Sequence, residues 1–174
     1  MRKFLDTLYT ISGALAAGFI VLICLVTAAQ VLLNLIAKVF GAHYSYTIPS
    51  YADFAGFFLA AASFLALAYT LTRGGHIRVT LLIQTFGRQS RLGAELFSLI
   101  FAASISGFAT YYMIRLNINA YGYGDLSFGI IAIPLWIPQL ALSAGLGILT
   151  IALIDLAWQT LRAQAPVLKN FESE

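Results

Sequence analysis

The sequence is poor in charge, in cysteine and in histidine. Charged residues make up 10% of the 174 residues, whereas a soluble domain carries about a quarter. Hydrophobic residues make up 60% of the chain, and its mean hydropathy is +0.87. These values are typical of an integral membrane protein. The single cysteine, Cys24, excludes a disulfide framework within the chain and a cysteine-rich zinc site.

The few ionisable residues avoid the middle of every long apolar segment. A charged side chain at the centre of a membrane helix costs roughly 2.5–3.5 kcal/mol on insertion scales, so charges kept there usually mark function. The two histidines, His43 and His76, lie between the apolar segments. A transmembrane b-type haem needs histidines at membrane depth, and a quinone-linked thiol oxidase needs cysteine pairs. The sequence therefore predicts no cofactor, no metal site and no enzyme activity.

Four segments are long and apolar enough to cross a bilayer. A helix needs about 20 mostly apolar residues to cross a hydrocarbon layer of about 30 Å. The predicted spans are residues 11–37, 54–72, 96–114 and 134–157, the last beginning near Pro134, because proline is tolerated in the first turn of a helix. The uncharged run over residues 7–37 is too long for the apolar region of a cleaved signal peptide. The sequence predicts an all-α integral membrane protein with four transmembrane helices in a single domain, residues 1–174.

Basic residues gather on one side of these spans. Two of them, Lys38 and Arg115, lie in the loops that follow the first and third spans. Eight lie on the opposite side: Arg2, Lys3, Arg73, Arg78, Arg88, Arg91, Arg162 and Lys169. Loops on the cytoplasmic side carry such an excess. We therefore expect both termini in the cytoplasm. Because topology accounts for the arginines, we expect contact with anionic lipids rather than with nucleic acid.

The segment between the second and third spans has a helical apolar stripe. Val79, Leu82, Ile83 and Phe86 fall at i, i+3, i+4 and i+7. This spacing predicts a short amphipathic helix that lies in the inner membrane interface. Two interpretations of it stay open: an ordinary connector, or a docking surface for another membrane subunit.

Small residues recur in two of the spans. Ala52, Gly56 and Ala60 follow one another at a spacing of four, and Gly145 and Gly147 lie in the fourth span. A spacing of four between small residues allows two helices to approach closely.

Three stretches, in this order along the chain, resemble the small membrane subunit of TRAP transporters, the DctQ type: "QVLLNLIAKVFG", "AYTLTRGGHIRVTLL" and "GDLSFGIIAIPLWIPQLALSAGLG". The resemblance covers nearly the whole chain, and its ordered set of motifs is more telling than any one of them. It implies a bacterial inner-membrane subunit of a tripartite, ion-coupled uptake system. In that family a periplasmic binding protein delivers an organic acid to a large permease subunit, which the small subunit braces. The candidate contacts with partners or lipids are Asp53, Arg73, His76, Arg78, Arg88, Asp125 and Trp136.

Three other classes of protein compete with a transporter subunit. A self-sufficient small exporter should carry an acidic residue at mid-membrane. A structural tetraspan protein would usually have a cysteine-stapled extracellular loop. A membrane enzyme would need converging polar residues, which the sequence does not place together.

Overall fold

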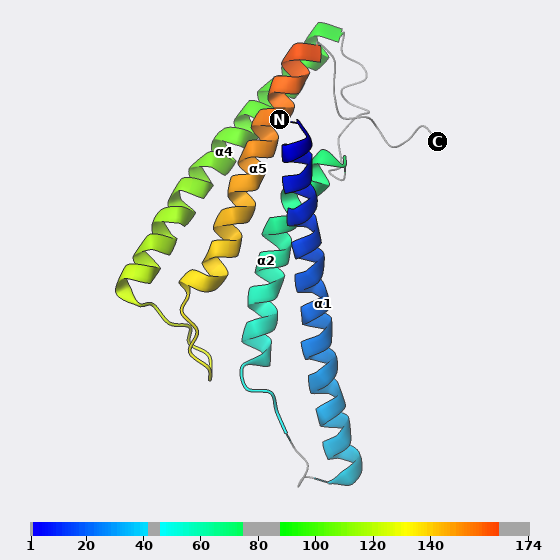
Figure 1. The fold of residues 1–174 in the computed structure, drawn as a ribbon, viewed down its shortest axis with the longest axis vertical. Helices are drawn as coiled ribbons and strands as arrows, with labels where there is room; N and C mark the ends of the chain where they lie inside the picture. Colours follow the sequence, from blue (N-terminus) through cyan, green and yellow to red (C-terminus); the bar gives the residue numbers. More distant parts are fainter. Residues whose placement is uncertain (1, 42–45, 75–87, 164–174) are drawn as a thin grey trace.

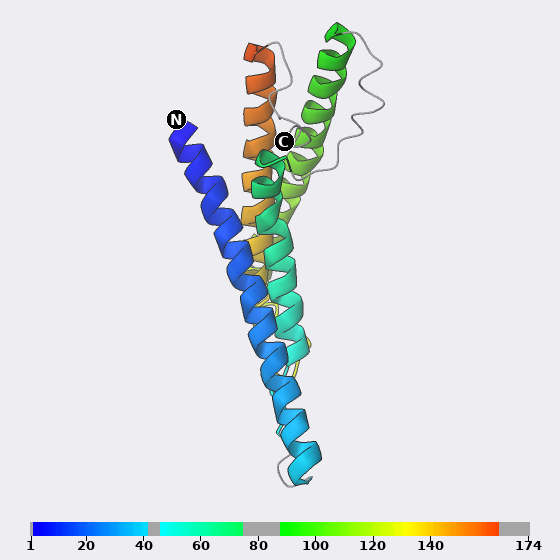
Figure 2. The same cartoon turned by 90° about the vertical axis from the view of Figure 1, so that its right-hand side faces the viewer.

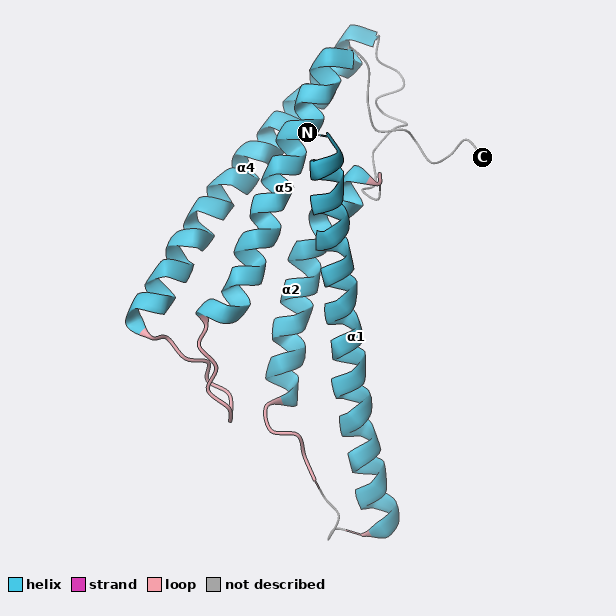
Figure 3. Cartoon of the chain, in the orientation of Figure 1, coloured by secondary structure: helices cyan, strands magenta, loops and turns pink. Residues whose placement is uncertain are grey.

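The computed structural model describes residues 2–41, 46–74 and 88–163 (Figure 1). In this part of the chain four α-helices follow one another: α1 (Arg2–Phe40), α2 (Tyr51–Thr72), α4 (Arg88–Tyr123) and α5 (Trp136–Ala163). Within these ranges there is no strand, only an isolated antiparallel bridge between Leu126 and Pro134 (Figure 3). All four helices are long and apolar enough to cross a membrane. The predicted fold class is confirmed.

Two helices run well beyond the apolar segments that predict them. α1 has 39 residues and α4 has 36, so at about 1.5 Å per residue both exceed 50 Å, against a hydrocarbon core of about 30 Å. α2, with 22 residues, matches that core. α5 begins at Trp136 rather than at Pro134. Pro138 lies in its first turn, where a backbone N–H would have no partner within the helix, so proline is tolerated there. The membrane boundaries themselves stay a prediction.

The helices form an open row rather than a closed bundle. α2 packs against both α1 and α5, and α4 packs against the other side of α5. Neither α1 nor α2 packs extensively against α4, so the order across the row is α1, α2, α5, α4 (Figure 1). Figure 2 shows that the upper ends of α1 and α4 diverge. In this row the end helices have only one neighbour along most of their length. Much of the apolar surface of α1 and α4 is therefore exposed.

The contact between α1 and α2 follows a stripe with alternating spacings of three and four. The stripe on α1 consists of its less exposed positions: Ser12, Ala16, Phe19, Ile23, Val26, Gln30, Leu33 and Ala37. Such spacing keeps one seam of a helix facing a partner that crosses it at a small angle. Across the seam, the hydroxyl of buried Ser12 donates to the carbonyl oxygen of Leu65 at 2.6 Å. The rings of Phe19 and Phe58 lie 5.7 Å apart.

The contact between α2 and α5 depends on a glycine. A Cβ atom at Gly145 would lie 2.5 Å from the carbonyl carbon of Phe64, which is closer than real atoms approach. The α2 side of the contact includes buried Ala61, Ala62 and Leu65. Gly56 has no atom within 4 Å of its added Cβ. The small-residue pattern of α2 therefore does not mark this contact, whereas Gly145 does.

The contact between α4 and α5 contains a cluster of hydroxyl groups. The Oγ1 atom of Thr150 lies 2.9 Å from Ser106 Oγ and 3.2 Å from Thr110 Oγ1. Nearer the Arg88 end of α4, Leu99 packs with Leu153 and Leu156 in a buried cluster. Hydroxyl pairs of this kind hold membrane helices together without placing a charge in lipid.

The predicted interfacial helix falls at residues 77–86, outside the described residues. It stays a prediction, and so do the two interpretations of it.

Candidate partner and lipid contact sites

The predicted contact residues divide between the two ends of the helix row. Asp53, Asp125 and Trp136 belong to the end where α2 begins, which we call the outer end, following the predicted topology. Arg73 follows α2, and Arg88 is the first residue of α4, both at the opposite, inner end. His76 and Arg78 lie outside the described residues. The fold thus separates the predicted contacts by the length of a membrane span.

At the outer end, the start of α2 has an unusual N-cap. Ser50 has φ 57° and ψ 21°, the left-handed region that residues other than glycine rarely adopt. Its hydroxyl does not cap its own helix. Instead it accepts the backbone N–H of Ile131 at 3.0 Å, from a segment 81 residues further along the chain. Ser50 therefore ties the start of α2 to the connection between α4 and α5.

That connection, residues 124–135, is named the outer loop here. Its two sides pair with each other: the N–H of Ser127 donates to Ile133 O at 2.8 Å, and the N–H of Leu135 donates to Asp125 O at 2.9 Å. The hydroxyl of Ser127 accepts the N–H of Ile133 at 2.9 Å. These bonds hold the loop in a hairpin-like shape with one serine at its centre.

A glycine lets the outer loop lie directly on α2. A Cβ atom at Gly129 would collide with Oδ2 of Asp53 and would lie 2.9 Å from the hydroxyl oxygen of Ser50. Asp53 itself lies in the first turn of α2, where the helix dipole favours a carboxylate. The aspartate predicted as a contact residue is therefore in contact with this chain's own loop.

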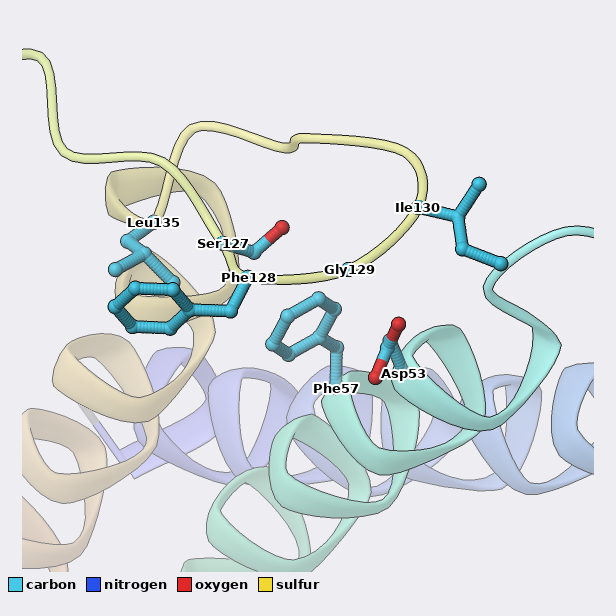
Figure 4. A pocket seen from close by; sticks show the side chains of 7 residues that line it. All are labelled: Asp53, Phe57, Ser127, Phe128, Gly129, Ile130 and Leu135. Carbon is cyan, nitrogen blue, oxygen red and sulfur yellow. The ribbon is translucent and has the colours of Figure 1, made fainter.

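Between the loop and α2 lies a shallow, open pocket of about 460 Å³ (Figure 4). Its lining consists of Asp53, Phe57, Ser127, Phe128, Gly129, Ile130 and Leu135. Asp53 is the one ionisable residue of this lining. A single carboxylate among apolar groups lacks the convergent polar groups that hold a small polar ligand, so the pocket resembles a contact surface more than a substrate site.

Aromatic residues border the outer end. The ring of Trp136 meets that of Tyr121 edge-on, with 5.7 Å between centroids. The carbonyl oxygen of Trp136 accepts a hydrogen bond from the Asn117 side chain at 3.3 Å. Tryptophan and tyrosine favour the boundary between lipid and water because each has an apolar ring and a polar atom. Contact between Trp136 and lipid headgroups stays a prediction.

At the inner end, arginines lie over aromatic rings. The guanidinium carbon of Arg73 is 5.3 Å from the ring centroid of Tyr69, and that of Arg162 is 4.9 Å from the ring of Trp158. Such cation–π contacts hold a guanidinium against an apolar surface. Arg2 adds a hydrogen bond from α1 to Gln159 of α5 at 3.2 Å. These contacts fix positive charge at this end of the row, and contact with anionic headgroups stays a prediction.

The residues that shape the outer end were not among those predicted from the sequence. Ser50 and Gly129 form the contact between the outer loop and α2, and Ser127 pairs the two sides of the loop. Each is a common loop residue with no distinctive spacing. The only signal was the quoted stretch "GDLSFGIIAIPLW", which carried the family resemblance but no assignment of contacts. Among the described residues, no group of three or more His, Cys, Asp or Glu residues could hold a metal ion.

Four apolar helices in an open row define a multi-pass membrane protein. A family model for the DctQ component of tripartite ATP-independent periplasmic transporters matches residues 23–163. The chain belongs to this family of transporter components, which confirms the family predicted from the sequence. Comparisons with curated proteins and with solved structures found no match.

Proposed function

We propose that this chain is the small, scaffolding subunit of an ion-coupled TRAP transporter that imports an organic acid. Its partners would be a large permease subunit and a periplasmic substrate-binding protein, with membrane lipids around them. The observation that carries the proposal is the open row of helices, in a chain that belongs to the DctQ family. A row has two broad faces and two free edges, and a subunit that braces a larger one needs such surfaces.

The exposed faces of the end helices support this role. On α1, large apolar side chains such as Leu15, Leu22, Leu25 and Leu32 are exposed. On α4 the exposed side chains include Phe97, Phe101, Phe108 and Tyr112, and neighbouring rings pair along the helix. Surfaces of this kind are compatible with lipid and with another apolar helix. They offer no place to bind an organic anion.

The interior of the row also fits a brace better than a carrier. Ion-coupled carriers form their sites near the bilayer midplane from broken helices, whose free backbone groups face the substrate. Here each helix runs unbroken through its apolar segment. Buried hydroxyls such as those of Ser12 and Ser106 bond across helix contacts. We therefore propose that the chain has no transport or enzyme activity of its own.

Reconstitution tests this proposal. The purified chain, placed alone in vesicles with an inward sodium gradient, should take up none of a panel of labelled organic acids. Adding the large permease and binding protein from the same genome should restore uptake, and the two membrane chains should copurify in mild detergent. Robust uptake by the small chain alone would instead establish a self-sufficient carrier.

The proposed localisation is the bacterial inner membrane, with both termini in the cytoplasm. It rests on the unequal distribution of lysine and arginine. Reporter fusions after Lys38 and near Asn119 should read periplasmic, and fusions after Arg88 and at the C-terminus should read cytoplasmic. A periplasmic C-terminus would overturn this topology.

The contact roles of Asp53, Arg73, His76, Arg78, Arg88, Asp125 and Trp136 also remain proposals. For the segment that contains His76 and Arg78, spin labels at Val79 and Leu82 should be shielded, and labels at Arg78 and Thr85 should be reached by polar quenchers. Equal accessibility at all four positions would argue against an interfacial helix and against docking through it.

A further inference from the structure

We propose that the outer loop is a lipid anchor, which inserts the side chains of Phe128 and Ile130 into the headgroup boundary of the membrane. The proposal rests on the chain spanning a membrane, and the choice of the outer leaflet follows from the proposed topology. The insertion itself requires neither that topology nor any transport activity.

The tip of the outer loop carries large apolar side chains that none of the described residues covers. Phe128 is 106% exposed and Ile130 is 85% exposed. Figure 4 shows the two side chains leaving the loop on either side of Gly129. Exposed apolar residues are common on membrane helices, but these two belong to a loop, where water would otherwise surround them. An apolar environment around the tip would remove both side chains from water, which is favourable for apolar surface.

The contacts of the loop place its tip at the edge of the hydrocarbon core. α2 has 22 residues, roughly 33 Å of helix, which matches a core of about 30 Å. Its first turn therefore lies at one boundary of the core. Ile131 and Gly129 of the loop contact Ser50 and Asp53 in and beside that first turn. Figure 1 shows the loop level with the start of α2.

The backbone of the loop suits this depth. Loops in contact with lipid must pair their backbone N–H and C=O groups within the protein, because hydrocarbon offers no partner. The N–H groups of Ser127, Ile131, Ile133 and Leu135 all donate to groups of this chain. These bonds pair the two sides of the loop. At the tip, the N–H groups of Phe128, Gly129 and Ile130 have no partner among the described residues, so the tip suits the headgroup boundary, where water and headgroups accept such bonds, and not the hydrocarbon core.

The composition of the loop favours lipid over a water-soluble protein as the surroundings of its tip. Residues 126–135 contain no charged side chain, whereas protein interfaces usually surround an apolar centre with a polar rim. Trp136, which follows the loop directly, pairs with Tyr121 in the manner of the aromatic residues that mark a membrane boundary. The loop thus continues the aromatic boundary.

The lone cysteine makes the test direct. In a Cys24→Ser background, single spin labels would be attached through Phe128→Cys and Ile130→Cys, in the full chain, in nanodiscs of phosphatidylethanolamine and phosphatidylglycerol. Collision with oxygen, which concentrates in lipid, should exceed collision with a water-soluble nickel chelate at both positions. A label at exposed Phe101 of α4 supplies the lipid reference, and a label at Asp125, at the charged end of the loop, supplies the aqueous one.

Three outcomes would overturn the anchor. The first is preferential collision with the nickel chelate at Phe128 and Ile130. The second is low collision with both reagents in the chain alone, which would mean that the loop folds against its own helices. The third is loss of oxygen collision only after the permease or binding protein is added, which would assign the tip to a protein partner.

A second measurement covers the case in which the labels disturb the loop. In a Trp136→Phe, Trp158→Phe background, Phe128→Trp should be quenched more strongly by lipids brominated near the headgroup than by aqueous iodide. The reverse order would contradict the anchor. Neither measurement involves uptake, so a failed reconstitution and a failed anchor are distinguishable.

Discussion

The two sides of α5 use different chemistry to hold their neighbours. Toward α2, Gly145 brings the helices so close that its backbone meets that of Phe64. Toward α4, Thr150 bonds to hydroxyls of Ser106 and Thr110, and Gly147 leaves ordinary space, 3.8 Å, between its added Cβ and Thr110. In lipid, helices gain little from the hydrophobic effect when they associate. Close packing therefore stabilises one contact, and polar pairing stabilises the other.

The largest expected effect is on the close contact. Gly145→Ala should lower the free energy of unfolding by about 1–3 kcal/mol, because the added methyl group overlaps rigid backbone atoms. Titration of the detergent-solubilised chain with SDS, followed by circular dichroism, measures this change. Gly147→Ala is the matched control, since it makes the same chemical change in the same helix where space exists. Equal effects of the two substitutions would remove the distinction between the two sides of α5.

A smaller effect is expected from the hydroxyl cluster. Thr150→Val keeps the shape of the side chain but removes both inter-helix hydroxyl contacts. Bonds of this kind contribute about 0.6 kcal/mol each on average and at most about 1.7, so the loss should be about 1 kcal/mol in the same titration. Thr27→Val is the control, because among the described residues the Thr27 hydroxyl bonds within its own helix, to Ile23 O. A control as damaging as Thr150→Val would show that the cluster adds nothing.

The smallest effect should come from Thr110→Val. This substitution removes one of the two hydroxyl contacts of Thr150 and leaves the contact with Ser106. We expect a loss of about 0.6 kcal/mol. The double variant Thr110→Val with Thr150→Val should lose less than the sum of the two single losses, since both remove the same bond. Strict additivity in this cycle would mean that the two threonines do not interact.

The inner and outer ends differ in how far the sequence predicted them. The excess of lysine and arginine on one side of the spans followed from residue counts alone, and Arg73 and Arg162 do lie at one end of the row. At the outer end, Asp53, Asp125 and Trp136 were selected as contacts, but Ser50 and Gly129, which also join the loop to α2, were missed. Counting charges requires no knowledge of which segments meet, whereas the bond between Ser50 and Ile131 exists only after two distant segments are brought together.

The class of protein and the number of helices were determined by the sequence itself. Long uncharged runs and a low charge content are local properties, and a chain of that kind can satisfy its backbone in lipid only by forming helices. The ends of α1 and α4 were less predictable. Hydropathy reports the part of a helix that suits lipid, while polar residues such as Gln89 and Asn117 continue the same hydrogen-bonded helix beyond it.

The tertiary structure alone decides which faces of the four helices are in contact. The four helices are apolar around most of their circumference, so periodicity does not single out one contact face as it does in a soluble bundle. Gly56, at the centre of the regular small-residue pattern, has no atom within 4 Å of its added Cβ. The isolated Gly145, in contrast, lies against a neighbouring backbone. Close approach depends on the shape of two surfaces together, and a single sequence describes each surface only separately.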